Sequence, residues 1–153
     1  EGTYYANLPS FRSGNYVKGV HLTFQKGVVV KIKAEEGQEF ATKQIAMDTG
    51  ASRVGEFSLT DRRFSRIDRF MADTLFDENF GGNHGNSHIA VGSSYTDSYT
   101  GSLANMTKAL KKKLGFNDSA LHWDLVNTEP KTVTAHLNSG KKLVIYEDGQ
   151  FKV

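Results

Sequence analysis

The chain has 153 residues, about the length of one domain with its own core, and its 38% hydrophobic and 24% charged residues are ordinary for a soluble globular protein. The formal net charge of +2 gives no reason to expect nucleic acid or an anionic membrane as a partner. Without cysteine there is no disulfide framework and no thiolate metal site, and no apolar run approaches the roughly 18 residues that a membrane helix needs. The absence of cysteine fits a cytoplasmic protein, and the N-terminal stretch "EGTYYANLPS" lacks the basic and apolar regions of a signal peptide.

The first predicted elements are a β-hairpin and a helix. Apolar and polar residues alternate on both sides of Lys26-Gly27, which predicts a hairpin within residues 21–37. Residues 36–53 contain good helix formers, with Gly50 as the predicted end of the helix. The apolar stripe of this helix consists of Phe40, Ile45 and Met47.

A short strand, a helical segment and a loop follow. Residues 53–59, "RVGEFSL", are predicted to form the strand. Apolar residues recur at spacings of three and four in residues 65–79, which predicts a helix or a helical turn. These apolar residues are Ile67, Phe70, Met71, Leu75 and Phe76. The glycine and asparagine content of residues 80–88, "FGGNHGNSH", predicts the loop.

One more helix is predicted over residues 102–115, with Asn105 as a candidate N-cap and Gly115 at its end. The lysines of "KALKKK" are expected on the solvated face and in the last turn of this helix, where cations suit the helix dipole. Residues 120–126 are predicted to form a strand.

The end of the chain is predicted to be antiparallel, with strands joined at Ser139-Gly140 and at Asp148-Gly149. No internal repeat or linker divides the sequence. Residues 1–153 are therefore predicted to form a single α+β domain, an antiparallel β-rich fold with two to three helices.

His122 and Asp124 lie two positions apart in the predicted strand "LHWDLV". Positions two apart face the same side of a strand, so Leu121, Trp123 and Leu125 are expected to face a core on the opposite side. An imidazole nitrogen and a carboxylate oxygen on one face can share a metal ion of the zinc, cobalt or manganese class. A hydrogen-bonded His–Asp pair on a wet sheet face explains the same pattern, and the pair alone leaves both interpretations open.

Two other places carry candidate metal ligands. Glu56 falls within an apolar strand, where an unpaired charge is costly to bury unless it faces outward at a sheet edge. The glycine-rich loop and the residues before it hold four more candidates, for which solvation at a helix end and simple exposure are the alternatives. These are Asp77, Glu78, His84 and His88.

Glutamate, histidine and aspartate without cysteine have the composition of a catalytic rather than a structural metal site. Carboxylate-rich sites can hold two metal ions about 3.5–4 Å apart and activate a water for hydrolysis. Tyr95 follows His88 by seven residues and is a candidate donor to a developing oxyanion, the alternative being an ordinary surface or core tyrosine.

Five motifs, taken in order, resemble the C-terminal catalytic region of the aminopeptidase T / aminopeptidase S family. They are "NLPS", "GASRVGE", "TLFDEN", "SHIAVGSSY" and "LHWDL". The resemblance runs from about Ala6 to the closing "DGQFKV", and "TLFDEN" followed by histidine, glycine and tyrosine is its more specific part. It implies a cytoplasmic, homodimeric metallo-aminopeptidase that acts on peptides with two divalent metal ions.

Carried over by residue, the resemblance implies that Glu56 bridges the metals and that His88, His122 and Asp124 bind them. Glu78 would be a ligand or an acid close behind the ligands. Tyr95 would stabilise the tetrahedral intermediate of peptide hydrolysis.

Two departures from the family pattern are expected. The family reads "NLP(S/T)EEVFT", whereas here "NLPS" is followed at once by "FRSGNYVKG", so about twenty or more residues that include one glutamate ligand are expected to be missing between Ser10 and Tyr16. The N-terminal domain of the family is also absent from this chain.

Three interpretations follow from the sequence. The leading one is the catalytic domain of a metal-dependent aminopeptidase. The second is a non-catalytic remnant of that family, which serves as a metal-binding or interaction module. The third is an unrelated antiparallel binding domain, in which Glu56, His88 and Asp124 would lie far apart.

Overall fold

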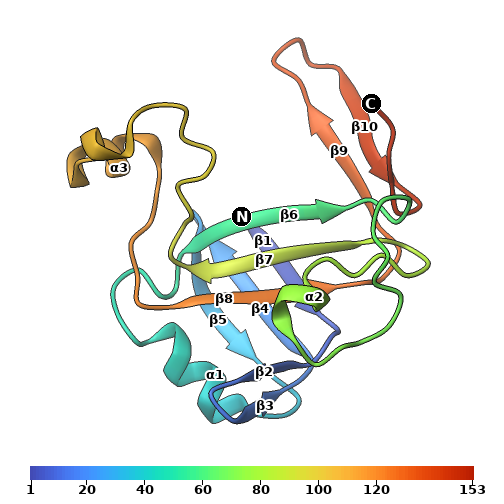
Figure 1. Ribbon diagram of the computed structural model, residues 1–153, viewed down its shortest axis with the longest axis horizontal. Helices are drawn as coiled ribbons and strands as arrows, with labels where there is room; N and C mark the ends of the chain where they lie inside the picture. Colours follow the sequence, from blue (N-terminus) through green and yellow to red (C-terminus); the bar gives the residue numbers. More distant parts are fainter.

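The computed structural model describes residues 1–153, and two three-stranded antiparallel sheets form its body (Figure 1). The first sheet has the order β1-β4-β5 and the second the order β6-β7-β8. Their strands are β1 (Gly2–Ala6), β4 (Val20–Gln25), β5 (Val28–Lys33), β6 (Val54–Thr60), β7 (Asn86–Gly92) and β8 (His122–Asn127).

The remaining elements surround this body. Strands β2 (Ser10–Arg12) and β3 (Asn15–Val17) pair with each other, and β9 (Thr132–His136), β10 (Lys142–Glu147) and β11 (Gln150–Phe151) form a third antiparallel sheet. The helices are α1 (Gln38–Ile45), α2 (Thr74–Asp77) and α3 (Lys108–Leu114), with a 3-10 turn at Leu103–Asn105. The β9–β10 hairpin and α3 project from the body as two separate arms (Figure 1). This architecture confirms the predicted α+β class, and no helix is long and apolar enough to cross a membrane.

The core lies between the two sheets. Leu22 of the first sheet and Val91, Trp123 and Leu125 of the second are almost fully buried in one apolar cluster. Burying a side chain of this size contributes about 1.5–3 kcal/mol. The indole N–H of Trp123 donates to Ser10 Oγ at 2.9 Å, so its polar atom is paired as well. The inward direction expected for the apolar residues of β8 is confirmed, which leaves the opposite face of the second sheet for polar side chains.

The predicted hairpin within residues 21–37 is confirmed by β4 and β5, and the strand prediction at residues 120–126 by β8. The predicted strand at residues 53–59 is confirmed by β6. Strands β1, β2, β3 and β7 were not predicted, because their alternation is short or is interrupted by glycine and asparagine.

The helix predicted within residues 36–53 ends at Ile45 rather than at Gly50. The next residues are held by a side chain instead of by helical hydrogen bonds: Asp48 Oδ1 accepts from the N–H groups of Gly50 and Ala51 at 2.8 Å each. Aspartate competes for nearby backbone donors in this way and favours turns over helix interiors.

The helical segment predicted within residues 65–79 is reduced to the single turn of α2. Asp77 is buried, and its carboxylate accepts from the N–H groups of Met71 (2.7 Å) and Asp73 (3.0 Å). Ala72 between them has φ = 57°, which a helix does not allow. The helical turn is confirmed and a longer helix is not, and the apolar residue Leu75 is 74% exposed.

Two boundaries also differ from the prediction. The loop predicted over residues 80–88 ends early, because β7 begins at Asn86 and already contains His88. The last helix begins after Thr107, whose hydroxyl caps Leu110 N–H, and not at Asn105. Its predicted end at Gly115 is confirmed by a left-handed C-cap with φ = 85°.

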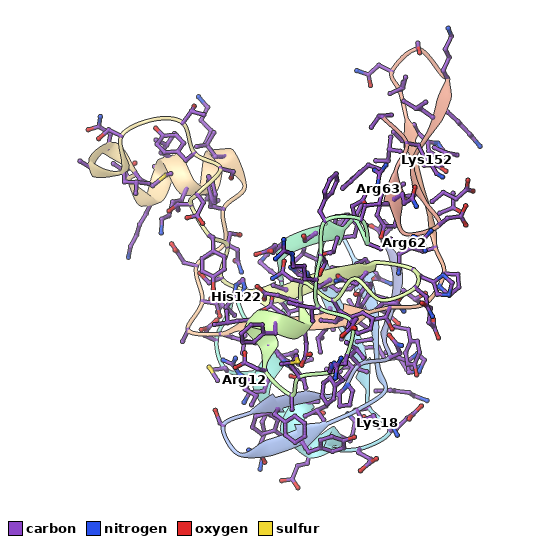
Figure 2. All side chains as sticks on the ribbon, turned by 45° about the vertical axis from the view of Figure 1, so that its right-hand side comes forward. Arg12, Lys18, Arg62, Arg63, His122 and Lys152 are labelled. Carbon is purple, nitrogen blue, oxygen red and sulfur yellow. The ribbon has the colours of Figure 1, made fainter.

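A buried carboxylate ties the C-terminal sheet to the body. Asp61 accepts three hydrogen bonds from the Arg63 guanidinium, the shortest at 2.6 Å, and one from Phe151 N–H at 2.8 Å. Arg63 lies at the base of the β9–β10 hairpin (Figure 2). The hydrogen bond to Arg63 holds the pKa of Asp61 well below its usual range.

We predict that Asp61→Asn lowers the free energy of unfolding at neutral pH by about 1.5–3 kcal/mol, the range for hydrogen bonds to charged groups. Because the folded pKa of Asp61 is lowered, its contribution is present above the unfolded pKa of about 3.9 and is lost as the pH falls below that value. Urea unfolding at neutral and acid pH measures both effects. Asp68→Asn, in the exposed pair with Arg69, is the matched control, and an equal effect of the two substitutions would contradict the prediction.

Candidate metal centre

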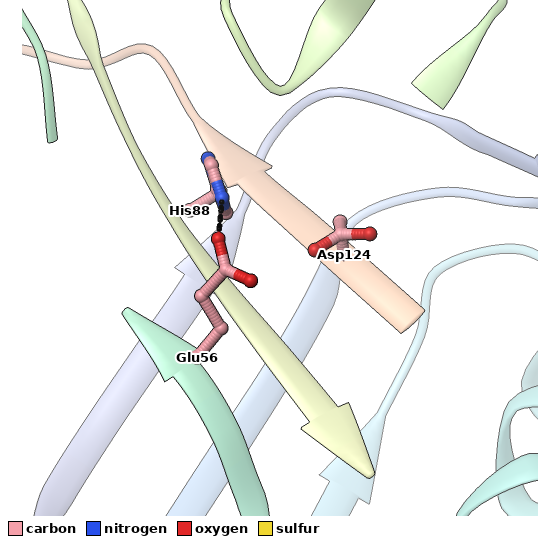
Figure 3. A group of neighbouring side chains, drawn as sticks. All are labelled: Glu56, His88 and Asp124. Atoms are coloured by element: carbon pink, nitrogen blue, oxygen red, sulfur yellow. Dashed lines mark hydrogen bonds and ion pairs between the residues drawn. The ribbon is translucent and has the colours of Figure 1, made fainter. Parts of the chain in front are cut away.

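The polar face of the second sheet gathers the predicted ligands onto three neighbouring strands. In the register of the sheet, Ala90 of β7 lies opposite both Glu56 of β6 and Asp124 of β8. His88 precedes Ala90 by two positions, so its side chain projects from the same face. Glu56, His88 and Asp124 offer ligand atoms that all lie within 4.8 Å of one another (Figure 3).

Glu56 divides its two carboxylate oxygens between two histidines. Its Oε1 lies 2.9 Å from His88 Nε2, whereas its Oε2 lies 3.8 Å from His122 Nε2. His122 Nε2 is also 3.3 Å from Asp124 Oδ1. A carboxylate with one oxygen directed to each side has the geometry of a bridging ligand between two cation positions.

Both histidines are oriented by backbone carbonyls. His88 Nδ1 lies 2.9 Å from the carbonyl oxygen of Glu78, and His122 Nδ1 lies 2.7 Å from that of Ser93. Because a carbonyl only accepts, each Nδ1 carries a hydrogen, and Nε2 is the nitrogen that faces the carboxylates and can offer a lone pair to a metal ion. Metal-binding histidines are held in this way, with the second ring nitrogen donating to a carbonyl or a carboxylate.

A buried carboxylate oxygen in this cluster has no hydrogen-bond donor. Asp124 is 7% exposed, and its Oδ1 accepts no hydrogen bond. Burial raises the pKa of Asp124, and the nearby Glu56 carboxylate raises it further. Imidazole nitrogens with carboxylate oxygens suit zinc, cobalt and manganese, so the residues present fit a divalent cation.

These groups border an open cleft of about 820 Å³. Glu56, Glu78 and Asp124 belong to its lining, together with the exposed ring of Tyr95 and several apolar side chains. No lysine or arginine lines the cleft. The carboxylates therefore have no protein cation within it to balance their charge.

Glu78 and Tyr95 lie beside the cluster rather than in it. The Glu78 side chain is half-buried, and burial followed by the repulsion of Asp124 raises its pKa. Partial burial and the same carboxylate raise the pKa of Tyr95, so its phenol keeps its proton and can donate. The Tyr95 ring centroid is 4.3 Å from that of His122, which lies where β8 meets the connection to the α3 arm (Figure 2).

The other candidates from the sequence lie outside the centre. Asp77 is used to hold the backbone near Met71, and His84 is exposed. The two remaining histidines, which are not candidates, also lie outside it: His21 stacks on Tyr5 in the first sheet with ring centroids 4.3 Å apart, and His136 is exposed at the end of β9.

Three residues of β7 shape the centre although no motif in the sequence marks them. Ala90 is fully buried between Glu56 and Asp124, and its single methyl group leaves room between the two carboxylates. Gly92, opposite His122, has φ = 104°, and a Cβ there would lie 2.1 Å from the Leu121 carbonyl oxygen. The third, Asn86, pairs with backbone carbonyls near Glu78. Because β7 was not predicted as a strand, no register placed these three residues beside the candidate ligands.

The comparison with known families matches residues 1–151 to the thermophilic metalloprotease (M29) family. The chain belongs to the M29 metalloprotease family.

Individual M29 relatives match the same stretch. Aminopeptidase T of Thermus aquaticus is 31% identical over 156 residues, and aminopeptidase AmpS of Bacillus subtilis is 29% identical over 154 residues. The solved structure of wild-type AmpT from Thermus thermophilus superimposes with a TM-score of 0.82 at 29% identity and takes in the whole chain. The chain spans 36% of the length of each of these relatives.

The segment expected to be missing between Ser10 and Tyr16 finds no support in this match. The M29 chain of 153 residues is covered completely by an alignment of 156 residues, a difference of three. In the structure, Ser10 and Val17 are paired across the tight β2–β3 hairpin, and Phe11 pairs with Tyr16.

We predict that Asp124→Asn stabilises the metal-free M29 chain at neutral pH. The folded pKa of Asp124 is raised, so the ionised side chain opposes folding as the pH rises above the unfolded pKa, and a neutral amide removes that cost. The same substitution removes a candidate metal ligand and is expected to weaken cobalt binding by more than about 100-fold, beyond the loss typical of outer partners.

Thermal unfolding with a chelator present, and cobalt titration without it, measure the two effects of Asp124→Asn separately. Asp118→Asn, an exposed carboxylate paired with Lys111, provides the charge-matched control. A lower melting temperature for Asp124→Asn than for the parent chain would contradict the assignment.

Proposed function

We propose that this chain is the metal-binding catalytic domain of an aminopeptidase that removes single residues from the N-termini of peptides. The observation that carries the proposal is Glu56, whose two oxygens face His88 on one side and His122 with Asp124 on the other. Peptide substrates and a homodimeric assembly, which the family resemblance implies, belong to the same proposal.

Two divalent ions of the zinc, cobalt or manganese class fit this donor set. His88 with Glu56 Oε1 would hold one, and His122 and Asp124 with Glu56 Oε2 the other. When bound, such ions lower the pKa of coordinated water and attract the free amino group of a peptide. The open cleft above the carboxylates, without lysine or arginine, leaves that face accessible to a cationic N-terminus.

Two further side chains fit steps of peptide hydrolysis. The raised pKa of Glu78 suits a carboxyl group that takes a proton from the attacking water and passes it to the leaving amine. Tyr95 remains a phenol and borders the same cleft, where its O–H can donate to the oxygen of the scissile carbonyl as negative charge develops.

The names of the relatives support this proposal, since aminopeptidase T and aminopeptidase AmpS match the whole chain. The alternative is a domain that binds metal without turnover. It is favoured by the limited coverage, because the chain corresponds to 36% of those relatives and the rest of such a protein can supply further site residues.

The test is release of p-nitroaniline from aminoacyl-p-nitroanilides by the cobalt-loaded chain. We expect activity that a chelator abolishes and that His88→Ala reduces to background, with His21→Ala as a histidine control outside the cleft. Activity unchanged by the chelator or by His88→Ala contradicts the proposal. Bound cobalt without turnover supports the metal-binding alternative.

Tyr95→Phe separates catalysis from metal binding. Loss of a single oxyanion donor typically lowers kcat by about 100- to 1000-fold, and we expect a fall of that size with cobalt affinity unchanged. Steady-state kinetics and metal titration measure the two quantities. Tyr99→Phe, in the same connection but outside the lining of the cleft, is the control. Equal kcat values for the two variants would remove Tyr95 from the mechanism.

A further inference from the structure

Asn86, the first residue of β7, is completely buried beside the metal centre. It precedes His88 by two positions, so both side chains project from the same face of the strand. The Asn86 side-chain amide donates to two backbone carbonyls, those of Phe80 at 2.6 Å and Glu78 at 3.1 Å. Both carbonyls lie in the turn that follows α2.

One of these carbonyls is the partner of a candidate metal ligand. The Glu78 carbonyl oxygen also lies 2.9 Å from His88 Nδ1, which donates to it, and 3.5 Å from the hydroxyl of Thr60. Because the Glu78 carbonyl accepts from Nδ1, its position holds the His88 ring with Nε2 toward Glu56, 2.9 Å from Oε1. Asn86 therefore acts on His88 through an oxygen that both residues share.

At position 86 the side-chain N–H donors make hydrogen bonds, whereas the side-chain oxygen makes none. Asn86 Oδ1 is buried and accepts no hydrogen bond, which is a cost that an apolar side chain would avoid. A carboxylate of the same shape would direct an acceptor at two carbonyl oxygens, and a serine hydroxyl could donate to only one of them. An amide satisfies both carbonyls at once.

We propose that Asn86 is a positioning residue that fixes the turn after α2, and through the Glu78 carbonyl holds His88 with Nε2 toward the metal centre. The proposal rests on the metal centre of the proposed function. Asn86 touches neither metal nor substrate in this role.

The test uses Asn86→Asp, which keeps the shape and removes the donors, and Asn86→Leu, which is neutral and of similar size. We expect cobalt affinity to fall about 10- to 100-fold in both, the loss typical of groups that orient metal ligands. Nitrogen NMR of the metal-free protein at mildly alkaline pH is expected to show His88 with hydrogen on Nδ1 in the parent chain, and a shift toward the other tautomer in the variants.

Asn127→Leu is the matched control, because Asn127 also donates from a β-strand to a carbonyl, that of Tyr5 at 2.9 Å. It is expected to change the melting temperature alone. If Asn86→Asp does not fold, Asn86→Leu decides by the same two measurements. Unchanged cobalt affinity and an unchanged His88 tautomer would overturn the proposal. A parent chain that binds no cobalt defeats the proposed function instead, and the His88 tautomer still decides the role of Asn86.

Discussion

The register of β7 between β6 and β8 is the constraint on which the rest of this structure depends. Ala90 opposite both Glu56 and Asp124 brings two carboxylates to the same level of the sheet, and His88 lies two positions away on the same face. Because side chains alternate along a strand, a slip of one residue would turn His88 into the core and Ile89 toward the cleft. The apolar face, with Val91, Trp123 and Leu125 buried against the first sheet, makes that slip costly. The same packing that stabilises the fold therefore fixes the site.

How much of the site could be predicted from the sequence depends on whether a residue pattern lies within one strand or requires pairing between distant strands. His122 and Asp124 were recognised as neighbours because alternation within one strand needs no knowledge of the fold. Their meeting with Glu56 and His88 depends on pairing between strands distant in the sequence, and only the family motifs implied it. Asn86 lies in residues 80–88, whose glycine and asparagine are typical of loops, and without a predicted strand at β7 no register could place Ala90 and Gly92 beside the carboxylates. Of the helix or helical turn predicted within residues 65–79 only the turn forms, because the Asp77 side chain holds the backbone before it in a non-helical path.

Without a bound cation, the buried carboxylates of the site lower the stability of the folded chain. Asp124 keeps a buried oxygen without a donor, and the pKa values of Asp124 and Glu78 are raised by burial among other carboxylates. A divalent cation would offset this repulsion, so binding and stability are expected to be linked. Outside the cleft, the buried carboxylates of Asp61 and Asp77 accept hydrogen bonds from Arg63 and from backbone N–H groups, respectively.

The central claim is that Glu56 bridges two cation positions. Anomalous diffraction from crystals of the cobalt-loaded chain tests it most directly. We predict two cobalt positions about 3.5–4 Å apart, one on each side of the Glu56 carboxylate, with His88 Nε2 bound to one and His122 Nε2 to the other. A single cobalt, or cobalt bound away from Glu56, would contradict it.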